Sequence, residues 1–269
     1  MKNREQEKYY EHMPSRFQKP SLLAWVGWVA FFALFIAGLK QGDVSFERLI
    51  TGSGNMFKFI MGAFPPDPSR LSSISVAMYE TFQIALVGTV FGVILSLPIA
   101  ILASRNTTIH PMVSYITKGI VSTLRTIPDL VWALIFVISV GLGPLAGILT
   151  ITLDTIGFCA RFFSERIEEI DKGPSEALES TGSSRLGVIM GSIIPIGFPS
   201  FVGTSLFSIE KAIRSAVVLG LVGAGGIGVE LSTSMTLRRF DEALMIIILI
   251  LIVVITVEQI SSTVRKKVI

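Results

Sequence analysis

Residues 174–200 read Pro-Ser-Glu-Ala-Leu-Glu-Ser-Thr-Gly-Ser-Ser-Arg-Leu-Gly-Val-Ile-Met-Gly-Ser-Ile-Ile-Pro-Ile-Gly-Phe-Pro-Ser and form a polar segment between two apolar stretches. Ser175 is of a type that caps helix N-termini, and acidic residues such as Glu176 are favoured in the first turn. Gly182 then stands where a glycine commonly ends a helix. We therefore predict a helix of about two turns, capped by Ser175 and ended by Gly182, that suits docking into a partner.

The rest of the chain has the composition of a membrane protein. Of its 269 residues, 51% are hydrophobic and only 16% are charged, whereas soluble domains average about 25% charged residues. The single Cys159 excludes an internal disulfide, and its neighbours predict a small buried side chain. His12 and His110 lie in polar segments where surface positions are expected, and no spacing predicts a metal or catalytic site.

Six apolar runs approach the length of about 20 residues that a helix needs to cross a bilayer. They predict an all-α polytopic membrane protein with about six transmembrane helices, the first of them uncleaved. The third run contains Arg125 and Asp129, and the fourth contains Asp154. The predicted spans are 21–39, 76–103, 113–140, 144–160, 188–208 and 243–260.

An even number of spans places both termini on the same side, and the basic residues indicate which side. Fourteen of the 23 basic residues fall on the side of the termini and the polar segment, and eight on the other. The positive-inside rule therefore predicts cytoplasmic termini. We expect a cytoplasmic segment at 1–20, a first span with an external loop at 21–75, a core at 76–260 and a cytoplasmic tail at 261–269. A net charge of +3 gives no reason to expect nucleic-acid binding.

Two other segments are interrupted by glycine or proline. Residues 40–75 contain Gly52-Ser53-Gly54 and Phe64-Pro65-Pro66, which predict the external loop. Residues 210–242 are apolar but rich in glycine, and we expect short helices or a re-entrant segment there. Such a backbone is tolerated at membrane depth only where protein buries it or where it lines a water-filled cavity.

The glycine-rich part of that segment spells a G-x-G-x-x-G motif at Gly223, Gly225, Gly226 and Gly228 with intervening Ala224 and Ile227. This motif binds dinucleotides only at a strand-to-helix turn with an acidic residue about 20 positions onward. Here the corresponding residues are apolar, and too little chain follows for that domain. We predict close backbone packing or a bend near the outer mouth of a pathway, because glycine lets chains approach.

Ionisable residues inside apolar runs are costly to bury and are therefore candidates for function. Their ordinary use is structural, as interhelical ion pairs, and the sequence alone assigns no pairs. Pro128, beside two of them, predicts a bend in the third span. The residues are Glu80, Arg125, Asp129, Asp154, Glu210 and Arg214.

The polar segment resembles the cytoplasmic loop of ABC importer permeases that begins Glu-Ala-Ala. Glu176-Ala177, Gly182 and Pro195 stand in the register of that loop, with Leu178 and Ser192 as departures. Residues 80–86, 125–134, 141–147, 214–228 and 240–243 are similar to phosphonate-type permeases, and the resemblance covers about 76–260. It implies the type I importer fold shared with methionine permeases.

The resemblance also implies partners and residue roles. It implies a homodimer in lipid, two ABC ATPase subunits on the cytoplasmic side and an external or periplasmic substrate-binding protein, in the bacterial inner membrane. The ATPases would use ATP and Mg²⁺, since this chain has no Gly-Lys dipeptide and so no phosphate loop. Coupling to the ATPase would involve Glu176, Ala177, Leu178 and Gly182. The outer end of the pathway would be shaped by Gly223, Gly225, Gly226, Gly228 and Arg214.

The substrate is less defined by the residues themselves. Basic residues expected on the outer side, including Lys211 and Arg214, favour an anion such as phosphonate, phosphite or a phosphate ester, but acidic residues are interspersed. A methionine-type or other small-solute importer is the alternative within the class. An ion-coupled secondary transporter using Glu80 or Asp154 is the alternative outside it. Such transporters are typically built from inverted repeats, and none is visible here.

Overall fold

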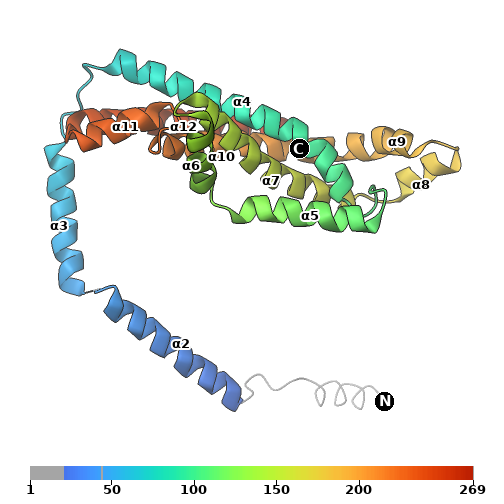
Figure 1. Cartoon of the computed structure of the whole chain (residues 1–269), viewed down its shortest axis with the longest axis horizontal. Coiled ribbons are helices and arrows are strands. Elements are labelled where there is room, and N and C mark those ends of the chain that lie inside the picture. Colours follow the sequence, from blue (N-terminus) through green and yellow to red (C-terminus); the bar gives the residue numbers. More distant parts are fainter. Residues whose placement is uncertain (1–20, 44, 269) are drawn as a thin grey trace, which may run out of the picture. The chain divides into compact units, whose positions relative to one another are not determined.

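The regular elements are all helices over residues 21–43 and 45–268, which the computed structural model describes. The chain divides into two units, Met1–Met61 and Gly62–Ile269, and each is described by itself. The cytoplasmic segment predicted for 1–20 lies outside the described residues. In chain order (Figure 1) the elements are α2 (Leu22–Gln41), α3 (Phe46–Gly62), α4 (Leu71–Ala103), α5 (Pro111–Thr126), α6 (Asp129–Val140), α7 (Pro144–Glu169), α8 (Gly173–Ser180), α9 (Arg185–Val188), the π-helix η1 (Ile189–Ile193), α10 (Ile194–Gly220), α11 (Ile227–Thr236) and α12 (Phe240–Val268).

The first unit contains α2 and α3. α2 is long and apolar enough to cross a membrane, which confirms the first predicted span. The Ser21 hydroxyl caps it by accepting from the Ala24 N–H at 3.3 Å. The prediction of a loop throughout 40–75 was wrong, because α3 occupies much of it. The Ser45 hydroxyl caps α3 through the Arg48 N–H, and the apolar residues recur on one helical face despite two internal glycines.

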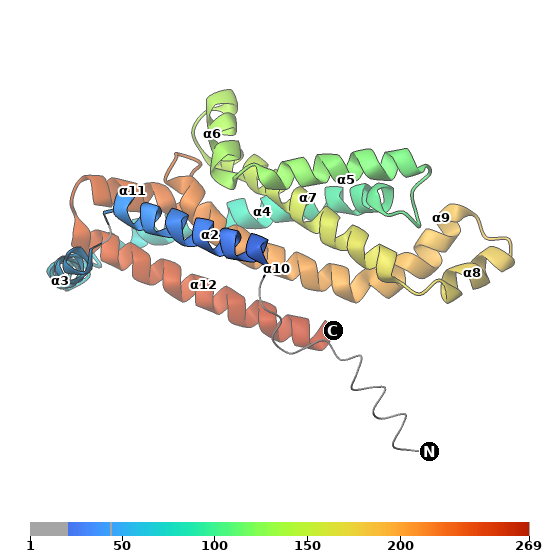
Figure 2. The same ribbon diagram turned by 90° about the horizontal axis from the view of Figure 1, so that it is seen from below.

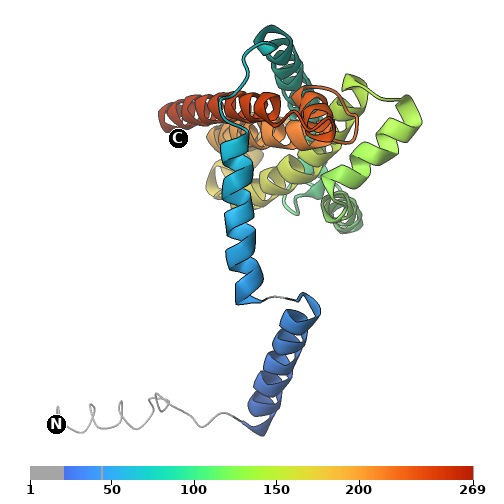
Figure 3. The same ribbon diagram turned by 90° about the vertical axis from the view of Figure 1, so that its left-hand side faces the viewer.

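In the second unit, α4 and α7 form a central pair against which α10 packs. α5 packs along α7, and α12 packs along α10. α8 and α9 lie at one end of this unit, the hook end, and α11 lies at the other, the α11 end (Figures 1 and 2). Seen end-on in Figure 3, α12 (red) and the α5–α6 pair (green) lie on opposite sides of α10.

Small residues bring α4 and α7 into backbone contact. A Cβ atom at Gly88 would lie 2.8 Å from Ile151, and one at Gly92 would lie 2.4 Å from the Thr155 side chain. Small residues four apart are typical of helix interfaces in membranes, where close packing replaces the hydrophobic effect as the driving force. The two helices are therefore so close that only glycine, which has no Cβ, fits at both positions.

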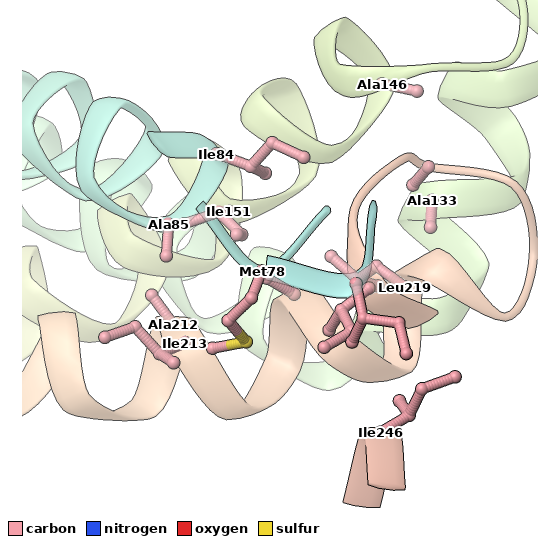
Figure 4. Packing of buried hydrophobic residues seen from close by; sticks show 14 residues of the cluster. Met78, Ile84, Ala85, Ala133, Ala146, Ile151, Ala212, Ile213, Leu219 and Ile246 are labelled. Carbon is pink, nitrogen blue, oxygen red and sulfur yellow. The ribbon is translucent and has the colours of Figure 1, made fainter. Parts of the chain in front are cut away.

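Apolar side chains fill the space around this contact. Figure 4 shows Met78 and Ile84 of α4 near Ile151 of α7, with Ile213 of α10 close by. A second cluster, around Phe163 and the fully buried Cys159, lies nearer the hook end. The predicted burial of Cys159 is confirmed.

The third predicted span is broken. α5 and α6 meet at an angle of 88° at Ile127-Pro128. Proline disfavours a helical conformation in the residue before it, and the observed ψ of 121° at Ile127 is extended. The bend predicted at Pro128 is confirmed, but a single helix over 113–140 was wrong.

The other spans are longer than predicted. α7 continues to Glu169, beyond its apolar part. In this extension Arg161 pairs with Glu165 one turn further on, which stabilises the helix. α10 continues to Gly220 because its charged residues find partners on neighbouring helices. The last helix likewise exceeds the predicted 243–260 at both ends.

Among the described residues, five helices are long and apolar enough to cross a membrane, or six spans if the bent α5–α6 pair forms one. The predicted count of about six is therefore supported. The short helix expected within 210–242 is α11, although the first part of that segment belongs to α10.

The α4–α7 contact generates a stability prediction. Replacing Gly92 with leucine forces the helices apart, and overpacking of this kind costs about 1–3 kcal/mol. We expect a thermal unfolding temperature lower by about 3–10 °C, read from the reaction of the sole Cys159 thiol with a fluorogenic dye in detergent. Gly119→Leu, where a Cβ meets nothing within 4 Å, is the control. Equal melting of both variants would contradict the packing role of Gly92.

Candidate functional site

The hook comprises α8, the turn 181–184 and α9. Its helix ends as predicted: Gly182 has φ of +81°, its N–H bonds to the Glu179 carbonyl at 2.9 Å, and the Ser183 N–H bonds to the Leu178 carbonyl at 3.2 Å. This pair of bonds is the Schellman arrangement, which favours glycine at the left-handed position. Glu176 and Ala177 are exposed on the helix that precedes this turn.

The predicted cap at Ser175 was wrong. α8 already begins at Gly173, because proline is tolerated in the first turn and Pro174 lies within it. The Ser175 hydroxyl instead lies 3.2 Å from that of Ser192 in η1. Leu178 is half-buried, and a Cβ at Gly191 would lie 3.3 Å from it, so α8 is held against the start of the long α10 span.

The loop between α4 and α5 braces the base of the hook. The Arg185 guanidinium donates to the Thr108 carbonyl. Asn106 donates to the Ile167 carbonyl at 2.7 Å, near the end of α7. The Glu168 carboxylate accepts from Lys118 of α5 at 2.7 Å. Arg185 thereby joins the hook to the loop between α4 and α5, and the other two bonds join that loop and α5 to the end of α7.

The glycine-rich turn between α10 and α11 packs against α4 and the start of α7. Gly223, Gly225 and Gly226 all have φ between +74° and +89°. A Cβ at Gly226 would lie 2.4 Å from the Thr81 hydroxyl, and one at Gly228 would lie 2.0 Å from the Val217 carbonyl. The prediction of close backbone packing is confirmed, and the described part of the chain places no strand before this turn.

Glu80 and Thr81 of α4 satisfy the backbone of this turn. The Glu80 carboxylate accepts from the Gly226 N–H at 3.3 Å, and the Thr81 hydroxyl accepts from the Ile227 N–H at 2.7 Å. These are N–H groups of the first turn of α11, which lack partners within their own helix. A carboxylate there also stabilises the positive end of the helix. Glu80 therefore has a structural use.

All the remaining ionisable candidates except Arg125 meet around α10. Lys211 donates to both oxygens of Asp154 on α7, at 2.7 and 2.8 Å. The Ser215 hydroxyl donates to Asp129 at 3.2 Å, at the first residue of α6. Together with Glu210, Arg214 and Arg265, these residues form what we term the α10 polar cluster.

Within the cluster, the Glu210 carboxylate joins two cations. Arg214 approaches it at 3.0 Å from one turn along α10, and Arg265 of α12 approaches its other oxygen at 3.4 Å. Glu210 is only 7% exposed, so both pairs compensate the cost of burying it. A cleft of about 300 Å³ adjoins the cluster and is lined by Asp129, Leu130, Arg214, Ser215, Val218 and Leu219.

Two residues that the sequence could not pair are placed by the structure. Lys211 lies within α10 and pairs with Asp154. Arg125 lies outside the ion pairs of the cluster, and the stem of its exposed side chain packs on Gly157 of α7. The spacing of Glu210 and Arg214, one helical turn apart in a continuing apolar stretch, is the sequence signal that α10 extends through this region.

A further ionic network, which the sequence did not indicate, lies at the α11 end. Arg70 pairs with Glu230 of α11 at 2.8 Å and with Glu242 of α12 at 3.2 Å. Glu242 and then Glu230 hold the pKa of the Arg70 guanidinium above its ordinary value. The described residues contain no group of three side chains suited to a metal.

The chain also has recognisable relatives. Residues 96–265 match the family of binding-protein-dependent transport system inner membrane components. The chain belongs to this family. This permease is 32% identical to the phosphite transport system permease protein PtxC of Stutzerimonas stutzeri over 238 residues, 88% of this chain and 86% of that protein. It is 35% identical over 221 residues to the phosphate-import permease protein PhnE of Mycolicibacterium smegmatis, 81% of this chain and 41% of that protein.

The fold of the permease also resembles a solved structure. It matches a chain of the inward-facing MetNI methionine ABC transporter with a TM-score of 0.67 and 20% identity, over 76% of this chain and 99% of that one. At that identity the likeness concerns the fold alone. It confirms the predicted type I importer fold.

The Lys211–Asp154 pair gives a second prediction for this permease. Lys211→Met leaves a largely buried carboxylate unpaired, which we expect to lower the unfolding temperature by about 5–10 °C. Asp154→Asn/Lys211→Met should recover most of that loss, since both charges are removed. Circular dichroism melts measure both variants, with Lys118→Met, at a more exposed pair, as control. Additive losses in the double variant would show that the two residues are not coupled.

Proposed function

We propose that this permease imports a phosphorus oxyanion, such as phosphite, a phosphonate or a phosphate ester, and is driven by a separate ATPase. Its family membership and the two relatives above support this assignment. The relatives are named for phosphite transport and phosphate import. Family membership displaces the ion-coupled secondary transporter as an explanation, and a methionine-type or other small solute is the remaining alternative within the class.

The proposed assembly contains two copies of this chain, two ATPase subunits at the hook end and a substrate-binding protein at the α11 end. ATP and Mg²⁺ bind to the ATPases, and this chain carries out no catalysis. The hook end is cytoplasmic in this assembly. α12 runs from the α11 end towards the hook end, and its last turn carries Arg265, Lys266 and Lys267 (Figures 1 and 2). That basic turn supports the orientation.

The hook transmits motion in this mechanism. Glu176 and Ala177 meet the ATPase because they are exposed on α8, whereas Leu178 anchors α8 to η1 and Gly182 sets the turn. When the ATPases close on ATP, they move the hook. Its contacts with η1, at the base of α10, and its bond to the loop after α4 carry that motion into the spans. The pathway then opens to receive the ligand from the binding protein, and hydrolysis resets it.

Reconstituted transport tests this function. The full chain, its ATPase and its binding protein are placed in liposomes, and uptake of phosphite, methylphosphonate and methionine is followed with and without ATP. We expect ATP-dependent uptake of at least one phosphorus oxyanion and none of methionine. Uptake of methionine alone, or uptake that persists without the ATPase, would contradict the proposal.

The hook gives a third prediction. Glu176→Lys reverses the charge of an exposed residue on the proposed docking face, and Gly182→Asp places a side chain on a backbone with φ of +81°. The double variant should lose most of the ATPase that copurifies with the wild-type chain, measured by quantitative mass spectrometry. Asp241→Asn, an exposed substitution at the α11 end, should retain it. Full retention by a folded double variant would exclude the hook as the docking element.

A further inference from the structure

The cleft beside the α10 polar cluster combines groups of opposite hydrogen-bonding character. Arg214 and Ser215 of α10 supply donors, Asp129 of α6 supplies acceptors, and apolar side chains complete the walls. Its volume of about 300 Å³ equals that of roughly ten water molecules in the liquid, which suffices for a small oxyanion. The break before Asp129 is what turns this carboxylate towards α10.

We propose that this cleft binds a phosphorus oxyanion in its protonated form, with Asp129 accepting from the P–OH group and Arg214 and Ser215 donating to the charged oxygens. The proposal rests on the function proposed above and adds a selective step within the permease itself. Its ligand class is an oxyanion that carries both a negative charge and an acidic hydroxyl.

The donors are held in place and keep spare capacity. A guanidinium has five N–H groups, and the bond to Glu210 at 3.0 Å uses one side of Arg214. The Arg214 side chain is 44% exposed, so its other donors reach the cleft. The Ser215 hydroxyl currently donates to Asp129 and rotates to donate to an anion instead.

The acceptor decides which anions enter. An ionised carboxylate only accepts hydrogen bonds, and Ser215 occupies one Asp129 oxygen, so the carboxylate has room for a P–OH donor. A fully ionised anion offers no proton, and the like charge of the Asp129 carboxylate repels it. Asp129 thus favours protonated oxyanions over sulfate, although Arg214 attracts both.

The neighbouring charges leave Asp129 as the acid that faces the cleft. Asp154 on α7 also neighbours Asp129, but Lys211 takes both of its oxygens. Glu210 is shared by Arg214 and Arg265. Arg125 on α5 does not line the cleft, and the stem of its exposed side chain packs on α7.

Protonation of the ligand gives the proposal its pH dependence. Phosphate monoesters lose their second proton near pH 6, and related oxyanions likewise change form around neutral pH. As the pH rises, the P–OH form disappears and binding weakens. Sulfate does not titrate in this range, so any change in its binding reports the protein's own groups.

The test measures binding of phosphite and sulfate to the full chain, purified with its ATPase in lipid nanodiscs, by calorimetry at about pH 6 and about pH 8. No binding protein is present, so its selectivity does not intervene. A hydrogen bond to a charged group changes affinity by about tenfold or more. We therefore expect phosphite to bind at least tenfold more weakly at the higher pH, and sulfate to bind at least tenfold more weakly than phosphite at the lower.

Four variants sharpen the test. Asp129→Asn should lose the pH dependence and accept sulfate within about threefold of phosphite, since an amide also donates. Asp129→Glu keeps the acceptor and should retain both properties. Arg214→Gln should bind neither anion, and Asp241→Asn, the matched substitution away from the cleft, should behave as the wild type. Gel filtration and basal ATPase activity report folding.

The proposal would be overturned if folded Asp129→Asn still bound phosphite in a pH-dependent way and still rejected sulfate. It would also be overturned if the wild-type protein bound both anions equally or bound neither. The liposome uptake assay separates this result from the function. Intact phosphite or phosphonate uptake with an inert cleft overturns only the site. If the liposomes take up no phosphorus oxyanion at all, the proposed import function itself is overturned.

Discussion

The contact between α4 and α7 determines the position of the other parts of the second unit. One face of α4 presents the small, buried residues Thr81, Ala85, Gly88, Gly92 and Ser96, so the two backbones approach until Gly88 and Gly92 leave no room for a Cβ. α7 in turn carries Asp154 towards α10 and Gly147 towards the carbonyl of Ala224 in the glycine-rich turn. A wider spacing between α4 and α7 would separate the glycine-rich turn from Thr81 and Glu80, which accept its backbone hydrogen bonds. The packing of the helices and the hydrogen bonding of the turn therefore depend on the same interhelical distance.

The intramembrane ionisable residues serve different purposes, although they look alike in the sequence. Glu80 accepts a backbone N–H and completes the start of α11. In contrast, Asp154 and Glu210 meet cations from other elements or turns. Asp129 accepts from the hydroxyl of Ser215, neighbours the carboxylate of Asp154 and lines a cleft. Inside an apolar environment each polar group needs a partner, and the kind of partner separates structural residues from candidates for ligand contact.

Much of this was predictable because periodicity and turn chemistry are local. The spans, the stop at Gly182 and the bend at Pro128 follow from apolar length, a left-handed glycine and proline sterics. The extension of α10 through Lys211 had only one local signal, the spacing of Glu210 and Arg214. That signal is not sufficient, because the charged turn is stabilised by partners on other helices, Asp154 of α7 and Arg265 of α12. α3 was missed for a related reason: Gly52 and Gly54 weaken a helix locally, but its capped start and apolar face outweigh that loss. Pairing across helices, and hence the α10 polar cluster, has no local signal.

α10 and the segment that precedes it connect the two parts of the molecule with proposed roles. Ser192 and Gly191 hold the hook at η1, and Lys211 lies about 30 Å further along the helix axis, at 1.5 Å per residue. The π-helix lies at the junction with the hook, and such insertions often mark functional positions because they loosen the regular ladder. A displaced hook therefore reorients α10 from its base. Because Lys211 is tied to Asp154, α7 follows in the proposed mechanism. α6 packs on both α7 and α10, and the bond from Ser215 to Asp129 joins α10 to the first residue of α6. Motion of α10 therefore reaches both walls of the cleft.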